Sequence, residues 1–512
     1  MSPHTGNAAT YFIDRHHGEG RGAKTAFVEG DRRLTYDELI DGSDRVSGML
    51  DRHGFRREDR LAMLVQDVIE FPLVFWGCLK AGVVPIPLNT LLTTEQYEYI
   101  LADSRVRGLV ISKALLEPLR ETIARSDALD TVFVVGGEAT PFLSLEQELA
   151  SSSPMPAVDV SGDEVAFWLY SSGSTGAPKG VRHVHASLKG TTDTYGADVL
   201  GIRDDDVVFS AAKLFFAYGL GNGMSFPLSV GATTLLLPGR PTPDAIATLM
   251  TEHKPTIFFC VPTLFAAILA SCGDAGIPGT DRLRLAVSAG EALPEEIGVR
   301  WTKATETEIL DGVGSTEMLH IFLSNAPGDV VYGTSGVAVP GYSVRLVDEG
   351  GCDVAAGEVG ELLVSGLTAA DGYWNNRAKT RATFEGNWTR TGDKYTRRPD
   401  GRYVYCGRTD DMFKVSGVWL SPFEVEQSLL THPCVLEAAV VAKRDEHGLE
   451  KPKAFLVLKD GTPSETLTDE IKTHVQAAIG PQKYPRWIEI VDDLPKTATG
   501  KIQRFRLRDA DT

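Results

Sequence analysis

Between about residues 25 and 290, short apolar runs alternate with longer segments in which apolar residues recur with the period of a helix. The runs have the length of buried strands. They lie at 60–65, 107–112, 131–136, 232–239, 256–262 and 283–290. Because the chain between neighbouring runs is long enough for a helix, consecutive strands are expected to lie parallel in βαβ units. We predict an α/β fold with two Rossmann-like subdomains, at 1–160 and 161–330.

The pattern changes after about residue 330. The stretch 333–366 is rich in glycine and valine, and its apolar runs are too close together for helices between them, which predicts a small antiparallel or β-barrel subdomain at 331–409. After GRTDD at 407–411 the pattern becomes that of a compact α+β module with a basic tail. Its predicted elements are a helix at 422–431, a hairpin at 434–461, a second helix and a strand at 487–493. We therefore predict a large N-terminal domain, 1–409, and a small mobile C-terminal cap, 410–512.

Composition narrows the class of protein. The chain has 51 basic and 69 acidic residues and a net charge of −18, which argues against nucleic acid or an anionic membrane as the main partner. The start of the chain lacks the apolar core of a signal peptide, and the longest apolar candidate span, 71–88, is interrupted by Lys80. The six cysteines form no CxxC pair, which favours reduced thiols over a disulfide framework or a metal site. We expect a cytoplasmic protein.

Residues 171–180, SSGSTGAPKG, follow an apolar run and have the composition of a phosphate-binding loop. The glycines leave backbone N–H groups unobstructed, and the hydroxyls can donate to phosphate oxygens. Lys179 adds a positive charge, and Pro178 restricts the backbone that leads to it. The stretch does not have the spacing of a Walker A loop. A flexible surface loop is the alternative interpretation of the serines and glycines alone.

This loop resembles the phosphate loop of the adenylate-forming enzymes, which include acyl-CoA synthetases, adenylation domains of peptide synthetases and firefly luciferase. Further motifs follow in the order of that superfamily, so the resemblance extends from 32–39 to Lys501. They are SAGEALP (288–294), DGVGSTEMLH (311–320), RTGDKY (390–395), YCGRTDDMFKVSG (405–417) and LPKTATGKIQR (494–504). The resemblance implies that a carboxylate attacks the α-phosphate of ATP, that pyrophosphate leaves, and that a thiol then attacks the acyl-adenylate.

Several of these motif residues suit that chemistry by their type. The triphosphate carries a magnesium ion, a hard cation that prefers carboxylate oxygen, and Glu317 matches the acid of the superfamily. Asp393 can accept hydrogen bonds from both ribose hydroxyls, and Arg408 can reinforce the same end of the nucleotide. Lys501 can bridge the substrate carboxylate and the α-phosphate. Taken singly, these residues could instead be surface turn residues, an ion pair and part of a solvated basic face.

The resemblance assigns catalytic roles to Lys501, Glu317 and Thr175, with Glu317 as the metal ligand. The residues implied in ATP binding are Ser171, Ser172, Gly173, Ser174, Thr175, Gly176, Lys179, Ala289, Gly290, Glu291, Asp311, Gly312, Ser315, Thr316, Asp393 and Arg408. This chain departs from many members at Val313, where they carry an aromatic residue that stacks on adenine. Stacking must therefore come from elsewhere or be replaced by aliphatic contact.

Asp410 matches the hinge of the superfamily, about which the cap rotates between the two half-reactions. After that rotation the loop around Lys414, Ser416 and Gly417 is expected to face the active site for thioester formation, and Lys501 is expected to leave it. A hinge is required because a fixed cap would block one of the half-reactions.

The acyl pocket is expected on KLFFAYGLGNG (213–223) and just after Glu317. Aromatic side chains with a small residue between them suit a flat ring better than a long flexible chain. These segments look particularly like those of the benzoate–CoA ligase group, and a packed core cluster is the alternative. The implied pocket comprises Phe216, Ala217, Tyr218, Ala289, Gly314, His320 and Ile321. His320 is expected to orient the substrate carboxylate by a hydrogen bond.

We therefore expect an AMP-forming aryl-CoA ligase that uses ATP, Mg²⁺ and coenzyme A to convert benzoate, or a small substituted benzoate, into its thioester. A hydroxybenzoate– or aminobenzoate (anthranilate)–CoA ligase and a ligase that loads a phosphopantetheine carrier protein are the alternatives within the superfamily. A phosphotransferase is disfavoured because residues 171–180 lack the spacing of a Walker A loop. The expected partners are a small aromatic acid and coenzyme A, without nucleic acid or membrane, and the chain is expected to act as a monomer or homodimer.

Overall fold

The computed structural model describes residues 6–126, 129–171, 177–273, 276–415, 418–446, 449–459, 466–496 and 502–509. They form two compact units. The larger unit takes in the described residues of Met1–Gly173, Ala177–Ser343 and Val364–Thr389, and the smaller unit those of Val344–Leu363 and Arg390–Thr512. In the described part of the chain, no helix is both long and apolar enough to cross a lipid bilayer.

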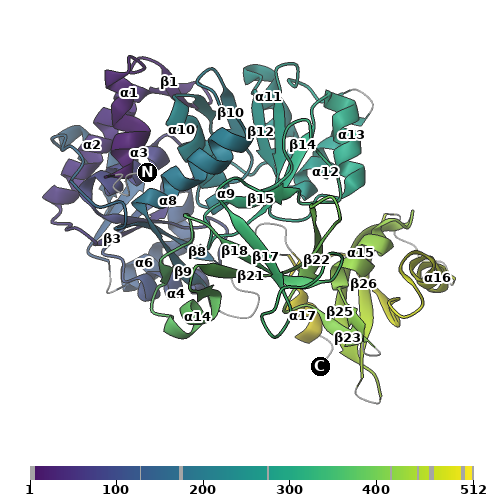
Figure 1. Ribbon diagram of the computed structural model, residues 1–512. Coiled ribbons are helices and arrows are strands. Elements are labelled where there is room, and N and C mark those ends of the chain that lie inside the picture. The colour runs from purple at the N-terminus through teal and green to yellow at the C-terminus, as the bar shows by residue number, and fades with distance from the viewer. Residues whose placement is uncertain are drawn as a thin grey trace. The chain divides into compact units, whose positions relative to one another are not determined.

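Two mostly parallel sheets form the framework of the larger unit (Figure 1). The first has the order β4 (Val84–Pro87), β3 (Arg60–Leu64), β5 (Gly108–Ser112), β6 (Thr131–Val135) and β7 (Leu143–Ser144), and its pairs are parallel. The second has the order β16 (Val337–Ala338), β15 (Ile321–Ser324), β14 (Ile309–Gly314), β13 (Leu285–Ser288), β12 (Ile257–Cys260), β10 (Val207–Ser210), β11 (Thr233–Leu235), β1 (Thr25–Glu29) and β2 (Arg32–Thr35). Its strands from β14 to β1 are parallel, and antiparallel strands flank them on both sides. The predicted α/β class is confirmed.

The helical segments of the larger unit connect these strands. In chain order they are η1 (Thr10–Asp14), α1 (Arg15–Gly18), α2 (Tyr36–Arg52), α3 (Glu70–Ala81), α4 (Thr94–Ser104), α5 (Lys113–Leu116), η2 (Glu117–Leu119), α6 (Arg120–Arg125), α7 (Leu145–Ser151), α8 (His185–Thr191), η3 (Thr192–Val199), α9 (Ala217–Leu220), η4 (Gly221–Ser225), α10 (Phe226–Val230), α11 (Pro243–His253), α12 (Pro262–Cys272), α13 (Glu295–Thr305) and α14 (Arg377–Thr383). The βαβ order expected from the alternating apolar runs is thus present.

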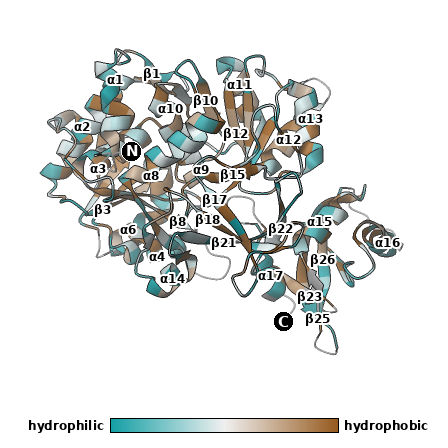
Figure 2. Cartoon of the chain, viewed as in Figure 1, coloured by the Kyte–Doolittle hydropathy of each residue, from teal (hydrophilic) through white to brown (hydrophobic). Residues whose placement is uncertain are grey.

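Apolar clusters cover both faces of each sheet. Helices α11, α12 and α13 bury side chains such as Trp301 against strands β10 to β13. Helices α4 to α6 cover one face of the first sheet, and α2 and α3, with Trp76 among their fully buried side chains, join its other face to the second sheet. Figure 2 shows hydrophobic residues concentrated on the strands and hydrophilic residues on the outer helices. The core of this unit is therefore a stack of helix and sheet layers.

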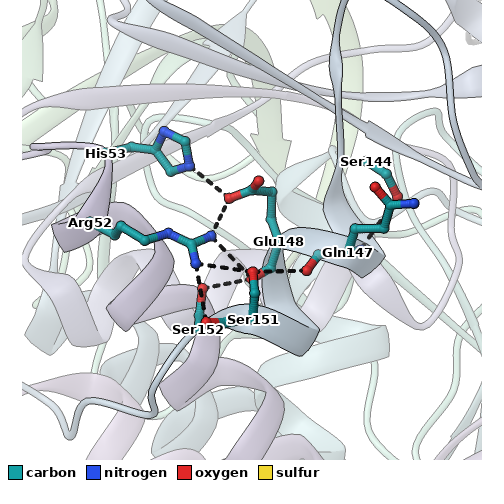
Figure 3. Close-up of polar contacts among 7 residues, drawn as sticks. All are labelled: Arg52, His53, Ser144, Gln147, Glu148, Ser151 and Ser152. Carbon is teal, nitrogen blue, oxygen red and sulfur yellow. Dashed lines mark hydrogen bonds and ion pairs between the residues drawn. The ribbon is translucent and has the colours of Figure 1, made fainter.

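Polar contacts fix both ends of α2. At its start the Thr35 hydroxyl accepts from the Glu38 N–H at 3.2 Å, and the Glu38 carboxylate accepts from the Thr35 N–H at 2.8 Å, which forms a capping box. At its end His53 Nε2 lies 2.7 Å from Glu148 Oε2 (Figure 3). The Arg52 guanidinium donates to the Ser151 carbonyl at 3.1 Å. These bonds hold the end of α2 against α7.

A separate sheet occupies the region where the sequence loses its helical spacing. Its strands are β17 (Ser343–Val347), β18 (Gly360–Ser365), β20 (Phe384–Glu385), β21 (Trp388–Arg397) and β22 (Tyr403–Arg408). Strand β21 pairs antiparallel with both β20 and β22. The strand order is β17-β18-β21-β20, with β22 paired to β21, so the region expected to hold a small antiparallel or barrel-like subdomain contains this sheet.

The last hundred residues form the α+β module predicted for them. Its elements are β23 (Phe413–Val415), β24 (Val418–Leu420), α15 (Pro422–Leu430), β25 (Val435–Arg444), β26 (Glu450–Leu458), α16 (Leu467–Ile479), β27 (Trp487–Ile490) and α17 (Arg504–Asp509). Strands β25 and β26 form the expected hairpin, and β27 joins β26 in parallel. Val425, Val440 and Ile471 are fully buried in the core of this module.

Candidate active site

The predicted nucleotide residues of the larger unit lie where β13 and β14 end. Parallel strands place their carboxyl ends at one edge of a sheet, where α/β proteins bind ligands. Ala289, Gly290 and Glu291 directly follow β13, and Asp311 lies opposite Ser288 in the register of β13 and β14. Gly290 has a φ of +96°, a conformation that disfavours any side chain, so this turn requires glycine.

Asp311 is a buried acid with an unusual ionisation. Its side chain is enclosed, since the residue is 4% exposed, and burial raises the pKa of its carboxyl to about 8. Its carbonyl accepts from the Asn325 backbone N–H at 3.0 Å and from the Asn325 side-chain amide at 3.1 Å. At neutral pH Asp311 is therefore mostly protonated and can both donate and accept a hydrogen bond.

A tight turn between β14 and β15 carries Glu317 and His320. The Ser315 hydroxyl accepts from the Met318 N–H at 3.2 Å. Leu319 has a φ of +66°, rare for a bulky residue, and its side chain is 2% exposed, so packing in the core holds the backbone in this conformation. As a result Glu317 is half-buried in the turn, whereas His320 points into the interior.

The predicted phosphate loop connects two antiparallel strands. Strands β8 (Val165–Ser171) and β9 (Lys179–Val184) pair with Ser171 opposite Lys179, and β19 (Gly372–Tyr373) adds a third strand beside β9. The connection is thus a β-hairpin, whereas a Walker A loop leads from a strand into a helix. The predicted ligands of the loop itself lie outside the described residues: Ser172, Gly173, Ser174, Thr175 and Gly176.

Tyr373 joins two of the predicted residues. Its hydroxyl donates to Glu317 Oε1 at 2.8 Å, and its ring centroid lies 4.7 Å from the Lys179 ammonium nitrogen. The sequence did not indicate this residue, because it stands 56 positions from Glu317 and belongs to none of the recognised motifs. A glycine-aromatic pair after a loop is the only local signal, and it carries no chemistry by itself.

Tyr218 anchors the predicted acyl pocket. Its hydroxyl donates to the Val287 carbonyl at 3.0 Å and lies 3.3 Å from the Cys260 carbonyl, which fixes the ring at the ends of β12 and β13. The ring centroids of Tyr218 and His320 are 5.6 Å apart. These two residues come from segments about a hundred positions apart, so the structure brings the two predicted halves of the pocket together.

Small and aliphatic residues complete the same region. Ile321 and Ala289 are 1% and 3% exposed, and Phe216 and Ala217 are half-buried at the start of α9. A Cβ atom at Gly314 would lie 2.5 Å from the His320 carbonyl oxygen, so only glycine fits there. The surroundings are apolar and rigid, which is suited to an aromatic ring.

His320 is a neutral imidazole with a defined proton position. Its Nε2 lies 3.0 Å from Asn222 Oδ1 and 3.3 Å from the Tyr218 carbonyl, and because a carbonyl can only accept, Nε2 carries the proton. Burial lowers the pKa of His320 to about 3, so Nδ1 is an acceptor at neutral pH. A hydrogen bond from His320 to the substrate carboxylate would have to be donated by Nε2–H, which faces Asn222 and the Tyr218 carbonyl in this structure, so that role stays a prediction.

In the smaller unit, Asp393 and Arg408 form an ion pair. They are register neighbours on β21 and β22, with Arg408 Nη1 2.9 Å from Asp393 Oδ1. Arg408 also donates to the Thr391 carbonyl at 3.1 Å. Gly392 makes room for the guanidinium, since a Cβ atom there would lie 2.8 Å from Nη2. The two residues predicted to contact the ribose are thus held as one polar pair.

The predicted hinge and loop residues are described only in part. Asp410 stands in the turn after β22, and Lys414 lies in β23. Ser416, Gly417 and Lys501 lie outside the described residues.

Ion pairs flank the segment that contains Lys501. On one side Lys496 Nζ lies 2.7 Å from Glu437 Oε2. On the other side Arg504 Nη2 lies 2.7 Å from Glu426 Oε2, and Arg504 Nη1 lies 3.3 Å from Asp411 Oδ2. Glu426 is nearly buried and also accepts from the Val440 N–H at 2.7 Å. The sequence motif points to its lysine and does not predict these anchoring residues.

The carboxylate of Glu317 suits a metal ion that binds together with a ligand. Across the part of the chain that is described, no three His, Cys, Asp or Glu side chains are arranged to hold a metal ion. Glu317 offers a single half-buried carboxylate. Mg²⁺ is often bound by one or two carboxylates together with water and substrate phosphates, so Glu317 suits a magnesium–nucleotide complex better than a resident ion.

Comparison with known proteins agrees with this arrangement. Residues 14–374 match the AMP-binding enzyme family, and residues 424–501 match the AMP-binding enzyme C-terminal domain. The chain is 53% identical over 507 residues to the 4-hydroxybenzoate–CoA/benzoate–CoA ligase of Rhodopseudomonas palustris, covering 98% of this chain and 94% of that protein. It is also 53% identical over 512 residues to the benzoate–CoA ligase of Thauera aromatica, covering 99% and 97%. A crystal structure of a benzoate CoA ligase from Burkholderia xenovorans LB400 matches with a TM-score of 0.90 and 48% identity, covering 98% and 99% of the two chains.

Proposed function

Because the chain belongs to the AMP-binding enzyme family, we propose that it activates benzoate, or a small ring-substituted benzoate, with ATP and transfers the aroyl group to coenzyme A. It is an AMP-forming acid–thiol ligase of the aryl-CoA type. One observation carries the choice of acid: Tyr218 and His320 form a rigid aromatic cluster in a chain that is 53% identical, over almost its full length, to ligases named for benzoate and 4-hydroxybenzoate.

In the first half-reaction a benzoate oxygen attacks the α-phosphorus of ATP. The bond from that phosphorus to the bridging oxygen breaks, and pyrophosphate leaves with the electron pair. Benzoate is ionised at neutral pH, so the step needs no general base. Lys501 neutralises the two anions as they approach each other, and the 171–180 loop with Lys179 holds the leaving phosphates.

Four residues hold the rest of the nucleotide in this proposal. Asp393 and Arg408 bind the ribose, and the protonated Asp311 offers a neutral hydrogen-bonding group at the ends of β13 and β14. Glu317 holds Mg²⁺, which neutralises charge on the triphosphate when it is bound. The site has no aromatic side chain at Val313, so aliphatic contact replaces stacking at that position.

In the second half-reaction the thiol of coenzyme A gives its proton to solvent as its sulfur attacks the acyl carbon, and AMP leaves with the electrons of the broken carbon–oxygen bond. We place the hinge for the change between half-reactions at Asp410, with 1–409 as the body and 410–512 as the cap. Lys414, Ser416 and Gly417 serve the thioester-forming conformation. The use of ATP and coenzyme A supports a cytoplasmic location, with the chain acting as a monomer or homodimer.

Product analysis tests the proposal. Purified protein with benzoate, Mg²⁺–ATP and coenzyme A is expected to form benzoyl-CoA, AMP and pyrophosphate in equal amounts. A parallel reaction replaces coenzyme A with a phosphopantetheinylated carrier protein, and free coenzyme A is expected to be the better acceptor. Formation of ADP and orthophosphate would refute adenylation. Faster loading of the carrier would reassign the thiol substrate while leaving adenylation intact.

A further inference from the structure

A short strap, residues 368–373, ties the phosphate hairpin to the turn that carries Glu317. At one end of the strap the Thr368 hydroxyl donates to the Met318 carbonyl at 2.8 Å, and the Ala370 N–H donates to the Glu317 carbonyl at 2.8 Å. At the other end the strap becomes β19, which pairs with β9. The backbone of the strap therefore fixes the spacing between two predicted parts of the ATP site.

Tyr373 is the side chain that extends this connection to the functional groups. It is 4% exposed, and its N–H donates to the Thr380 hydroxyl at 3.1 Å, so its backbone and ring are held in place. Its hydroxyl donates to Glu317 Oε1 at 2.8 Å. The face of its ring lies 4.7 Å from the Lys179 ammonium nitrogen, within the range of a cation–π contact.

The contacts of Tyr373 act differently on Glu317 and on Lys179. A phenol has one proton to donate, and giving it to Oε1 of Glu317 leaves Oε2 for another ligand. Hydrogen bonds to a ligating carboxylate orient it toward its metal, and their loss typically lowers metal affinity by about 10–100-fold. The ring, by contrast, acts on Lys179 through its π electrons and needs no hydroxyl.

We propose that Tyr373 is a positioning residue for the magnesium–ATP complex: its hydroxyl orients Glu317 toward Mg²⁺, and its ring holds Lys179 at the phosphate loop. The inference rests on the proposed function of Glu317 and Lys179 in ATP binding. It assigns the hydroxyl and the ring separate effects, so two substitutions of one residue can distinguish them.

The chain offers a matched control in the same strap. The Tyr342 hydroxyl lies 2.8 Å from the Thr368 hydroxyl, and because Thr368 donates to the Met318 carbonyl, Tyr342 donates to Thr368. Tyr342→Phe removes a buried hydrogen bond from the strap without touching Glu317 or Lys179. Tyr342→Phe is expected to lower the free energy of unfolding, as Tyr373→Phe does, but to leave the affinity for Mg²⁺ unchanged. Urea unfolding of each variant checks that it is folded.

The test measures the binding of ATP in the absence of benzoate or any other acyl substrate. Binding is measured first in EDTA and then, without EDTA, while Mg²⁺ is titrated at a fixed ATP concentration. Tyr373→Phe is expected to weaken Mg²⁺ binding by about tenfold or more and to leave ATP binding in EDTA near the wild-type value. Tyr373→Leu is expected to weaken both. Thioester formation from supplied benzoyl-adenylate should stay within about twofold of wild type in Tyr373→Phe, since that step uses neither Glu317 nor the leaving phosphates.

A Mg²⁺ affinity in Tyr373→Phe equal to that of wild type, or a loss matched by Tyr342→Phe, would overturn the inference. An equal loss in thioester formation would also overturn it, because a general structural defect would then be responsible. The binding titration contains no benzoate or other acyl substrate, so a failure of the wild-type protein to activate benzoate would refute the proposed function without affecting this result.

Discussion

At the scale of single residues, burial decides what the polar groups of the site can do. His320 and Asp311 are both enclosed, and desolvation acts on them in opposite directions: it lowers the pKa of the imidazole to about 3 and raises that of the carboxyl to about 8. Both groups are therefore uncharged near neutral pH. Neither side chain therefore adds a charge that would attract or repel an anionic substrate near neutral pH.

Asp311→Asn tests this view of the buried acid. Asparagine resembles the protonated carboxyl, so KM for ATP at pH 7 should stay within about threefold of wild type. As pH rises through about 8, Asp311 ionises and wild-type kcat/KM for ATP should fall, by about tenfold at one unit above the pKa, whereas the variant should not show this loss. The measurement is kcat/KM for ATP from pH 6 to 9.5. Superimposable profiles would contradict the assignment.

The same residue links pH to stability. Because the folded pKa of Asp311 is raised above the 3.8 of an exposed aspartate, the folded protein binds the proton more tightly than the unfolded chain. Its contribution to stability is complete below about pH 4 and is lost as pH rises through about 8, at up to about 1.4 kcal/mol per pH unit. Urea midpoints should therefore decline less with rising pH in Asp311→Asn than in wild type.

Contacts between residues of the recognised motifs could be predicted from the sequence, whereas contacts that involve residues outside those motifs could not. Asp393 and Arg408 could be paired from sequence because both lie in recognised motifs, and neighbouring strands put them in register. The proton position of His320 could not be predicted, since it depends on Asn222, which is 98 positions away and lies in no motif with it. Tyr373 was missed for the same reason.

At the scale of elements, backbone and ion-pair contacts lie on both sides of the segment that contains Lys501. The isolated bridge between Lys496 and Ile502 closes the base of the segment, and the Arg504 side chain on α17 reaches both Glu426 on α15 and Asp411 near the hinge. Arg504 and Glu426 are 21% and 5% exposed at their side chains, so the pair is largely protected from solvent. This network belongs wholly to the smaller unit.

Arg504→Ala is expected to reduce adenylate formation by about 10–100-fold, because the lysine three positions earlier loses its anchor and small displacements of a catalytic group are costly. Thioester formation from supplied benzoyl-adenylate should fall less than about threefold. Arg508→Ala is the matched control: Arg508 also contacts Asp411, at 2.6 Å, but not Glu426. Pyrophosphate release and thioester formation are measured separately. An equal effect of the two variants on adenylation would contradict a role for the Glu426 anchor.

The elements themselves were largely predictable. Runs such as 60–65 and 131–136 became β3 and β6 because their apolar residues are buried on both faces of a parallel sheet. The place of β1 and β2 in the second sheet, beside β11, was not predictable, because it depends on a pairing between strands some two hundred positions apart.

At the scale of the whole molecule, the chain divides into two compact units, and the proposed mechanism assigns them different tasks. The larger unit holds the aromatic cluster, Glu317 and Lys179. The smaller unit holds Asp393, Arg408 and the segment with Lys501. The sequence pattern instead predicts a boundary at 409/410, which would group Asp393 and Arg408 with the larger domain, whereas their contacts group them with the C-terminal residues.

Asp410→Pro tests the hinge. Proline fixes φ at its own position and restricts the residue before it, so a turn that must change conformation between half-reactions should be blocked. Pyrophosphate release in a single turnover should stay near wild type, while transfer of the aroyl group to coenzyme A should fall by about tenfold or more. Stopped-quench assays follow the two products. Unimpaired transfer would show that the hinge lies elsewhere.

The central claim is that this ligase selects a small aromatic acid. The most direct test is a competition in which benzoate, 2-, 3- and 4-hydroxybenzoate, 2-aminobenzoate, cinnamate and octanoate are offered together at equal concentration with Mg²⁺–ATP and limiting coenzyme A. Mass spectrometry of the acyl-CoA products then reports relative kcat/KM for all acids at once. The rigid cluster around Tyr218 and His320 predicts that benzoyl-CoA or a monosubstituted benzoyl-CoA dominates and octanoyl-CoA is negligible. A product mixture dominated by octanoyl-CoA would contradict the account.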